Sequence, residues 1–146
     1  MIQYVRAKKS LGQHFLKDEN IARMIVESLR PITKNVVEIG AGTGVLTKYL
    51  IADKRFVTTV VEIDHESIGY LRNTFPALRN IVAEDFLQAD LSRFGTFSII
   101  GNLPYNISSQ IFFRTLEFRD NIPQVVCMIQ KEVAERISSK EGCRAY

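Results

Sequence analysis

Three glycines at alternate positions follow an apolar run near residue 40. Residues 36–44 read VVEIGAGTG, and Gly40, Gly42 and Gly44 end this stretch. Glycines let a backbone approach a ligand closely and adopt positive φ. The spacing differs from the dinucleotide-binding pattern G-x-G-x-x-G because position 45 is Val45, and no Lys-Ser/Thr pair follows to cradle a phosphate. The loop therefore indicates a ligand that is not held through a pyrophosphate.

Carboxylates accompany this loop along the chain. Glu62 and Asp85 each follow an apolar run, and Glu38 lies just inside the glycine loop. A carboxylate placed like Glu62 can accept hydrogen bonds from both hydroxyls of a ribose. Asp85 is followed by Phe86, whose ring could pack on a flat ligand. One acid after a strand is commonly a helix cap, but three acids around one glycine loop predict a site for a nucleoside that carries positive charge.

A second motif, GNLPYNISSQ at residues 101–110, places an amide, a proline and a tyrosine after another apolar run. The amine of adenine is a poor nucleophile because its lone pair is delocalised into the ring. The side-chain oxygen of Asn102 and a backbone carbonyl near Leu103 or Pro104 could accept hydrogen bonds from that amine and localise the lone pair. Pro104 restricts the loop, and Tyr105 offers a stacking face worth roughly 1–3 kcal/mol per base. The alternative is a strand-to-helix turn with an Asn cap. The position after a fourth strand favours a pocket for an adenine that has left its stack.

The elements predicted around these motifs alternate between strands and helices. Hydrophobic patterns predict strands at 35–40, 56–64, 80–86, 97–101 and 124–130, and helices at 45–54, 65–75, 107–118 and from 131 onward. A first helix begins after the N-cap residue Asp18 and ends at Pro31. Nearly all-apolar strands that alternate with helices indicate a doubly wound α/β domain whose mainly parallel sheet is covered on both faces. In such folds ligands bind beyond the carboxyl ends of the strands, where these motifs lie.

The composition is that of one globular domain. The chain has 146 residues, of which 46% are hydrophobic and 24% charged. No apolar run approaches the ~20 residues that cross a membrane, and no apolar segment typical of a secretory signal follows the N-terminus. The two cysteines, Cys127 and Cys143, are too few for a disulfide framework and are not spaced as metal ligands. We therefore expect no metal site, no membrane partner and a cytoplasmic location.

The first 17 residues form a basic arm. They contain Arg6, Lys8, Lys9 and Lys17 and no acid, in a chain whose net charge is only +3. Such an arm is either a solvated tail or a segment that is attracted to a phosphate backbone.

Six segments carry a resemblance to a known family: KSLGQHFL (9–16), VVEIGAGTGVLT (36–47), VVEID (60–64), EDF (84–86), GNLPYNIS (101–108) and QKEVAERI (130–137). Together they resemble the KsgA/RsmA family of ribosomal RNA small-subunit adenine N6-dimethyltransferases. The glycine loop and the two later acids also resemble the S-adenosylmethionine site of class I (Rossmann-like) methyltransferases. The resemblance implies that S-adenosyl-L-methionine is the methyl donor. It also implies that two adjacent adenines in the 3′-terminal stem-loop of 16S RNA, in an immature 30S particle, each receive two methyl groups at N6.

The resemblance also implies roles for individual residues. The positions implied to bind the donor are Gln13, His14, Leu16, Glu38, Gly40, Gly42, Glu62, Ile63, Asp85, Phe86 and Asn102. The catalytic positions, which would form the pocket of the target adenine, are Asn102, Leu103, Pro104 and Tyr105. Gln13, His14 and the Leu16 backbone would flank the methionine part of the donor, although many members have Asn where this chain has His14.

The adenosine part of the donor would be held by the later motifs. Glu62 would hold the ribose and Asp85 the adenine amine. Ile63 and Phe86 would sandwich the adenine ring.

The family continues past the segment that matches GCRAY into further strands and a small helical domain. We therefore expect residues 1–17 to be a basic arm that carries part of the donor site, and residues 18–146 to be an incomplete catalytic domain truncated after its fifth strand. The C-terminal helical RNA-binding domain is expected to be absent. We expect a monomer that binds the donor and is weak or inactive on RNA.

Three other functions stay open. An Erm-type methyltransferase of 23S ribosomal RNA would share every motif, although NLPYNISS and QKEVAERI favour the small-subunit branch. A DNA adenine methyltransferase usually has Asn/Asp-Pro-Pro-Tyr, and Leu103 weakens that option. A non-enzymatic small-subunit assembly factor is the third.

Overall fold

A computed structural model of the chain describes residues 4–11 and 15–140. Gln13 and His14, predicted to bind the donor, lie outside the described residues, as does Cys143. The strands are β1 (Asn35–Ile39), β2 (Val57–Val61), β3 (Asn80–Val82), β4 (Ser98–Asn102) and β5 (Val125–Met128). The helices are α1 (Glu19–Glu27), α2 (Thr47–Ala52), α3 (His65–Thr74), α4 (Ser108–Glu117) and α5 (Lys131–Ile137), with short 3-10 helices η1 (Lys9–Leu11) and η2 (Leu91–Phe94).

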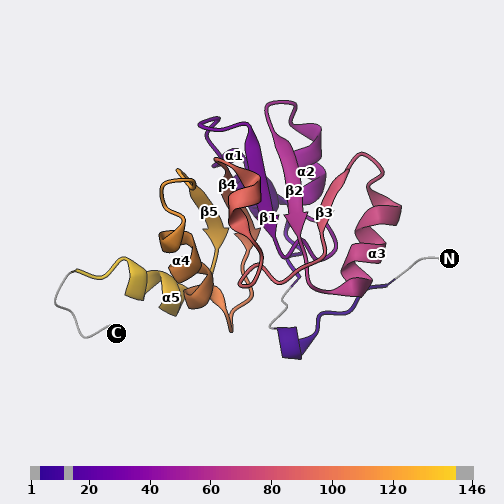
Figure 1. The fold of residues 1–146 in the computed structure, drawn as a ribbon. Coiled ribbons are helices and arrows are strands. Elements are labelled where there is room, and N and C mark those ends of the chain that lie inside the picture. Colours follow the sequence, from indigo (N-terminus) through magenta and orange to yellow (C-terminus); the bar gives the residue numbers. More distant parts are fainter. Residues whose placement is uncertain (1–3, 12–14, 141–146) are drawn as a thin grey trace.

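The five strands form one parallel sheet in the order β3-β2-β1-β4-β5 (Figure 1). The β1–β2 pair runs in register from Asn35 opposite Val57 to Ile39 opposite Val61, and β4 pairs with the other side of β1. Because every pair is parallel, the carboxyl ends of all five strands meet at one edge. The strand order reverses direction at β1 and β4, which makes that point of the edge the expected ligand position.

Both faces of the sheet are covered, because successive strand residues point to opposite sides. Val36 packs with side chains of α1 and α2, whereas Val37 packs with Ile111 of α4 on the other face. Val60 packs with Leu71 of α3. The doubly wound α/β architecture predicted from the sequence is therefore confirmed.

The observed elements are shorter than predicted at several ends. The helix predicted at 45–54 begins at Thr47, because the glycine loop continues as turns through residue 46. The strand predicted at 80–86 ends at Val82, and Asp85 instead accepts a hydrogen bond from the backbone N–H of Leu87 at 2.9 Å. Within the described residues, no helix is long and apolar enough to span a membrane.

The predicted start of the first helix is confirmed. The carboxylate of Asp18 accepts hydrogen bonds from the backbone N–H groups of Asn20 and Ile21, at 2.9 and 3.2 Å. This N-cap fixes the point at which the chain passes from the arm into α1, and so it places Leu16 beside the sheet edge.

Candidate functional site

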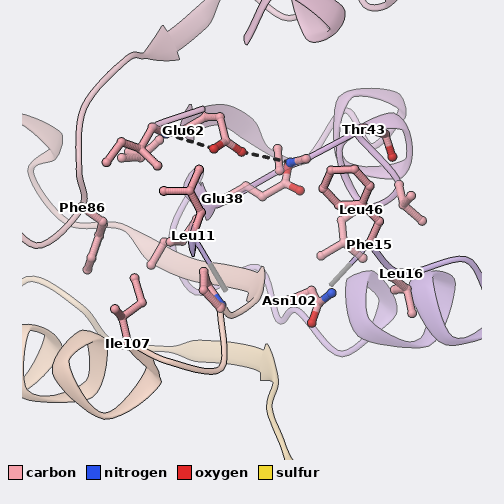
Figure 2. Close-up of a pocket in the computed structure, with 18 of the residues that line it drawn as sticks. Leu11, Phe15, Leu16, Glu38, Thr43, Leu46, Glu62, Phe86, Asn102 and Ile107 are labelled. Carbon is pink, nitrogen blue, oxygen red and sulfur yellow. Dashed lines mark hydrogen bonds between the residues drawn. The ribbon is translucent and has the colours of Figure 1, made fainter. Parts of the chain in front are cut away.

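A cavity opens at the carboxyl edge of the sheet, beside the point where the strand order reverses. It holds about 800 Å³ when the space out to the solvent is included. Its walls come from the ends of β1, β2 and β4, the loops that follow β1 and β3, and the arm residues Leu11, Phe15 and Leu16 (Figure 2). The cavity therefore brings together residues that are up to 96 positions apart in the chain, from Leu11 to Ile107.

The glycine loop is hydrogen-bonded to the acid that follows β2. Gly42 has a φ of +57° and donates its N–H to Oε2 of Glu62 at 3.0 Å. The other oxygen of Glu62 accepts from the N–H groups of Ile63 and Asp64, each at 3.0 Å. A side chain at position 42 would begin 3.0 Å from the ring of Phe15. Glycine is therefore required here by both the backbone conformation and the close approach of the arm.

Glu62 is buried, with an exposed fraction of 3%. Burial raises the pKa of its carboxyl, and the three backbone N–H donors act in the opposite direction without cancelling the effect. These donors fix the orientation of the carboxylate at the cavity wall.

Glu38 lies within β1 rather than just inside the glycine loop, as the sequence had suggested. Its side chain is 1% exposed, and Oε2 accepts a hydrogen bond from the hydroxyl of Thr47 at 2.6 Å. Burial raises the pKa of Glu38 to about 8, with a further contribution from the neighbouring Glu62. At neutral pH burial therefore favours the protonated form of Glu38.

Asp85, Ile63 and Phe86 also line the cavity. Phe86 is 3% exposed, whereas the apolar side chain of Ile63 is 46% exposed at the cavity wall. Oδ1 of Asp85 accepts from the N–H of Leu87, and its Oδ2 has no hydrogen-bond partner among the described residues. The predicted acid and the two predicted ring neighbours therefore come together at one cavity.

Asn102 ends β4 and borders two hollows. It lines the cavity described above and also a second hollow of about 590 Å³, counted out to the solvent. The second hollow lies beside the end of β5, where the N–H of Leu103 donates to the carbonyl of Met128 at 3.1 Å. Its lining residues are Asn102, Leu103, Tyr105, Met128, Ile129 and Gln130. Asn102 thus borders both spaces.

Pro104 lies apart from the other residues predicted for the target pocket. Its ring would come within 4.0 Å of a side chain added at Gly40, and it lines the first cavity rather than the second. Tyr105 lines the second hollow and is 42% exposed.

Several lining residues were not predicted. Leu11 and Phe15 line the first cavity from the arm, and the signal for them was two large apolar residues, spaced four apart, within a basic segment. Residues 128–130 line the second hollow because β5 pairs with β4, and nothing in the sequence indicated that pairing. No group of three or more His, Cys, Asp or Glu residues in the described part of the chain could hold a metal ion.

The chain is similar to several known proteins. The family model described as ribosomal RNA adenine dimethylase matches residues 4–146. A ribosomal RNA small subunit methyltransferase A from Flavobacterium johnsoniae is 55% identical over 99% of this chain, which corresponds to 57% of that relative. The crystal structure of the 23S rRNA methyltransferase ErmE is 32% identical with a TM-score of 0.73, over 84% of this chain and 50% of ErmE. A dimethyladenosine transferase from Plasmodium falciparum is 27% identical with a TM-score of 0.73, over 91% of this chain and 49% of its own. The chain thus spans somewhat more than half the length of the curated relative.

Proposed function

Because the chain belongs to the ribosomal RNA adenine dimethylase family, we propose that it contains the S-adenosylmethionine site and the target-adenine pocket of such an enzyme. The substrate we propose is the pair of adjacent adenines in the 3′-terminal stem-loop of 16S RNA, within an immature small subunit. The observation that carries the proposal is the position of Asn102 between two hollows. One hollow would hold the methyl donor and the other the acceptor base.

The charge of the first cavity suits a cationic donor. Its described lining includes four acidic residues, Glu38, Glu62, Glu84 and Asp85, and no Lys, Arg or His. Glu38 is protonated at neutral pH because its pKa is about 8, and a bound cation would favour its ionised form. A sulfonium and an ammonium group are both stabilised by nearby carboxylates, whereas phosphates are repelled.

The remaining predicted donor contacts fit the same cavity. Oδ2 of Asp85 is an available acceptor for an adenine amine, and Ile63 and Phe86 offer apolar surface to its ring. Glu62 would accept from the ribose hydroxyls. We propose that residues 1–17 act as an arm of this site and residues 18–146 as the catalytic domain.

The chemistry requires positioning more than a strong base. The donor supplies an activated methyl group on sulfur, which leaves as a neutral thioether when the N–C bond forms. Asn102 and a carbonyl near Leu103 or Pro104 would accept hydrogen bonds from the target amine and localise its lone pair toward that methyl. Tyr105 would stack on the base, and the proton lost from the amine would pass to solvent.

Titration calorimetry with S-adenosylmethionine tests the donor site. We expect saturable one-to-one binding that Glu62→Gln and Glu62→Ala weaken by about tenfold or more, equivalent to about 1.4 kcal/mol. Glu27→Ala is the matched control, because Glu27 is exposed on α1, away from the lining residues. Glu62→Gln is included because its amide oxygen can still accept the hydrogen bond from the glycine loop, so this variant is expected to keep the local fold. A folded wild-type chain that does not bind the donor, or that binds it equally well without Glu62, would contradict the proposal.

A further inference from the structure

The N-terminal arm is attached to the body of the domain through Lys8. The Nζ atom of Lys8 lies 2.5 Å from Oδ1 of Asp64 and 3.5 Å from Oε1 of Glu66. Asp64 directly precedes α3, and in Figure 1 the indigo arm passes close to that end of the helix. The contact joins residues that are 56 positions apart, so it is not a local feature of a basic tail.

Asp64 is a buried carboxylate with a divided role. Its side chain is 2% exposed. Oδ2 accepts hydrogen bonds from the N–H and the hydroxyl of Ser67, at 3.1 and 2.7 Å, and so caps α3. Oδ1 accepts a hydrogen bond from the ammonium group of Lys8. Burial alone would raise the pKa of Asp64, but the hydrogen bonds from Lys8 and Ser67 outweigh it and the pKa lies below its ordinary value. The hydrogen bond to Asp64 raises the pKa of Lys8, so both partners are charged at neutral pH.

The ion pair connects two walls of the donor cavity. On one side, the N–H of Asp64 donates to Oε1 of Glu62 at 3.0 Å. On the other side, the carbonyl of Lys8 accepts from the N–H of Leu11 at 3.1 Å, and Leu11 lines the cavity. Further along the arm, Phe15 packs against Gly42 and lines the same cavity. Lys8 itself is not among the lining residues.

We propose that Lys8 is a positioning residue of the donor site: its ion pair with Asp64 holds the N-terminal arm across the mouth of the cavity. Lys8 acts on the donor through the arm and through the Asp64–Glu62 hydrogen bond, without touching the donor. This inference rests on the proposed function for the identity of the ligand. The inference assigns this role to Lys8 and not to Lys9, because Lys9 is exposed and has no ion pair among the residues described.

The test compares Lys8→Met with Lys9→Met, two variants that remove the same charge one position apart. Donor affinity is measured by calorimetry and the donor dissociation rate by stopped-flow displacement, each at about 0.05 M and about 0.5 M salt. Because one partner of the ion pair is buried, we expect Lys8→Met to weaken binding at least threefold, near the upper end for partly exposed ion pairs. The loss should lie mainly in faster dissociation. Salt should weaken donor binding in the wild type and in Lys9→Met more than in Lys8→Met, since salt screens the ion pair.

Asp64→Asn completes a double-mutant cycle. Asn is a good N-cap, so α3 keeps its cap while the charge is lost. If Lys8 and Asp64 act through their ion pair, Lys8→Met should lower the donor affinity only slightly when Asp64→Asn is already present. Thermal unfolding of each variant without donor verifies that it is folded.

The outcomes separate this inference from the proposed function. The inference would be wrong, and the proposed function would stand, if Glu62→Gln weakened donor binding while Lys8→Met and Lys9→Met both left the donor affinity nearly unchanged. Additive effects in the cycle would overturn it too. A folded wild type that binds no donor would overturn both.

Discussion

At the scale of single residues, Glu38 is a titratable side chain that is almost completely removed from water. It is buried at the floor of the cavity, with the Thr47 hydroxyl at 2.6 Å and Glu62 nearby. A cationic donor would favour its ionised form, whereas burial favours the protonated form. Glu38 is therefore a group through which donor binding and protonation are linked.

The stability of the donor-free chain should depend on pH through Glu38. Its pKa is about 8 in the folded chain, against 4.5 ordinarily. Below pH 4.5 both states hold the proton. Between pH 4.5 and 8 only the folded state holds it, so the free energy of unfolding falls as pH rises, by up to about 1.4 kcal/mol per unit. Above pH 8 the contribution of Glu38 to this decrease in the free energy of unfolding should level off, because both states are then ionised.

Urea unfolding of the wild type and Glu38→Gln from pH 5 to 9 measures this effect. In Glu38→Gln, the free energy of unfolding should lack the decrease that Glu38 causes up to pH 8. Glu27→Gln, an exposed control on α1, should show the same pH dependence as the wild type. Parallel curves for the wild type and Glu38→Gln would contradict the raised pKa and show that Glu38 is ionised in the folded chain.

At the scale of elements, the strand ends position the residues that line the cavity. Gly101 restricts the position of one of them, Asn102. Gly101 precedes Asn102 in β4, and a Cβ at this position would lie 2.8 Å from the carbonyl oxygen of Ile39 in β1. A backbone atom inside a paired sheet cannot move away easily. Gly101→Ala should therefore push the end of β4 outward and shift Asn102.

We expect Gly101→Ala to lower the free energy of unfolding by about 1–3 kcal/mol, as overpacking does. Gly69→Ala is the matched control, because Gly69 lies in α3 and an added Cβ there would meet nothing within 4 Å. That substitution should stabilise the chain by roughly 0.5–1 kcal/mol, since Gly is a poor helix former. Urea denaturation measures both, and equal stability of Gly101→Ala and the wild type would mean that the sheet yields at this position.

The same elements show what the sequence could predict. The strands at 57–61 and 98–102 were predictable because helices cover both faces of the sheet, so these strands are mostly buried and contain no charged residue. The turn at residues 86–88 was not predictable, because it depends on the Asp85 carboxylate accepting a hydrogen bond from the backbone N–H two residues on. The 3-10 helices η1 and η2 are too short to create a periodic pattern.

The candidate site divides in a similar way. That Glu62 and Asp85 lie close together could be predicted, because acids after parallel strands must meet at one edge, and both line the cavity. The lining by residues 128–130 follows from β5 lying next to β4, which is a pairing of distant segments. The contact between Lys8 and Asp64 also joins distant segments, and in the sequence Lys8 looks like any other cation of the arm.

At the scale of the whole molecule, the remaining question is which RNA the second hollow accepts. The motifs alone left the small-subunit and Erm-type functions open. The small-subunit substrate is the one proposed above, and the Erm-type substrate is its alternative. The matches to the small subunit methyltransferase A from Flavobacterium johnsoniae and to ErmE cover only 50–57% of the relative's length, so the preference for one RNA is a better measure for this chain than its absolute rate.

We expect this chain to transfer labelled methyl groups to immature small subunits in preference to protein-free 23S RNA, at a low absolute rate. Asn102→Ala should abolish transfer to the small subunit, because the target amine loses its acceptor where the two hollows meet, and removal of one such group typically costs about 10²–10³ in rate. Donor binding by the same variant, measured by calorimetry, shows whether the first cavity is intact. Label placed mainly on 23S RNA would assign the chain to the Erm-type function. Transfer that survives in Asn102→Ala would remove this residue from the chemistry, whichever RNA is methylated.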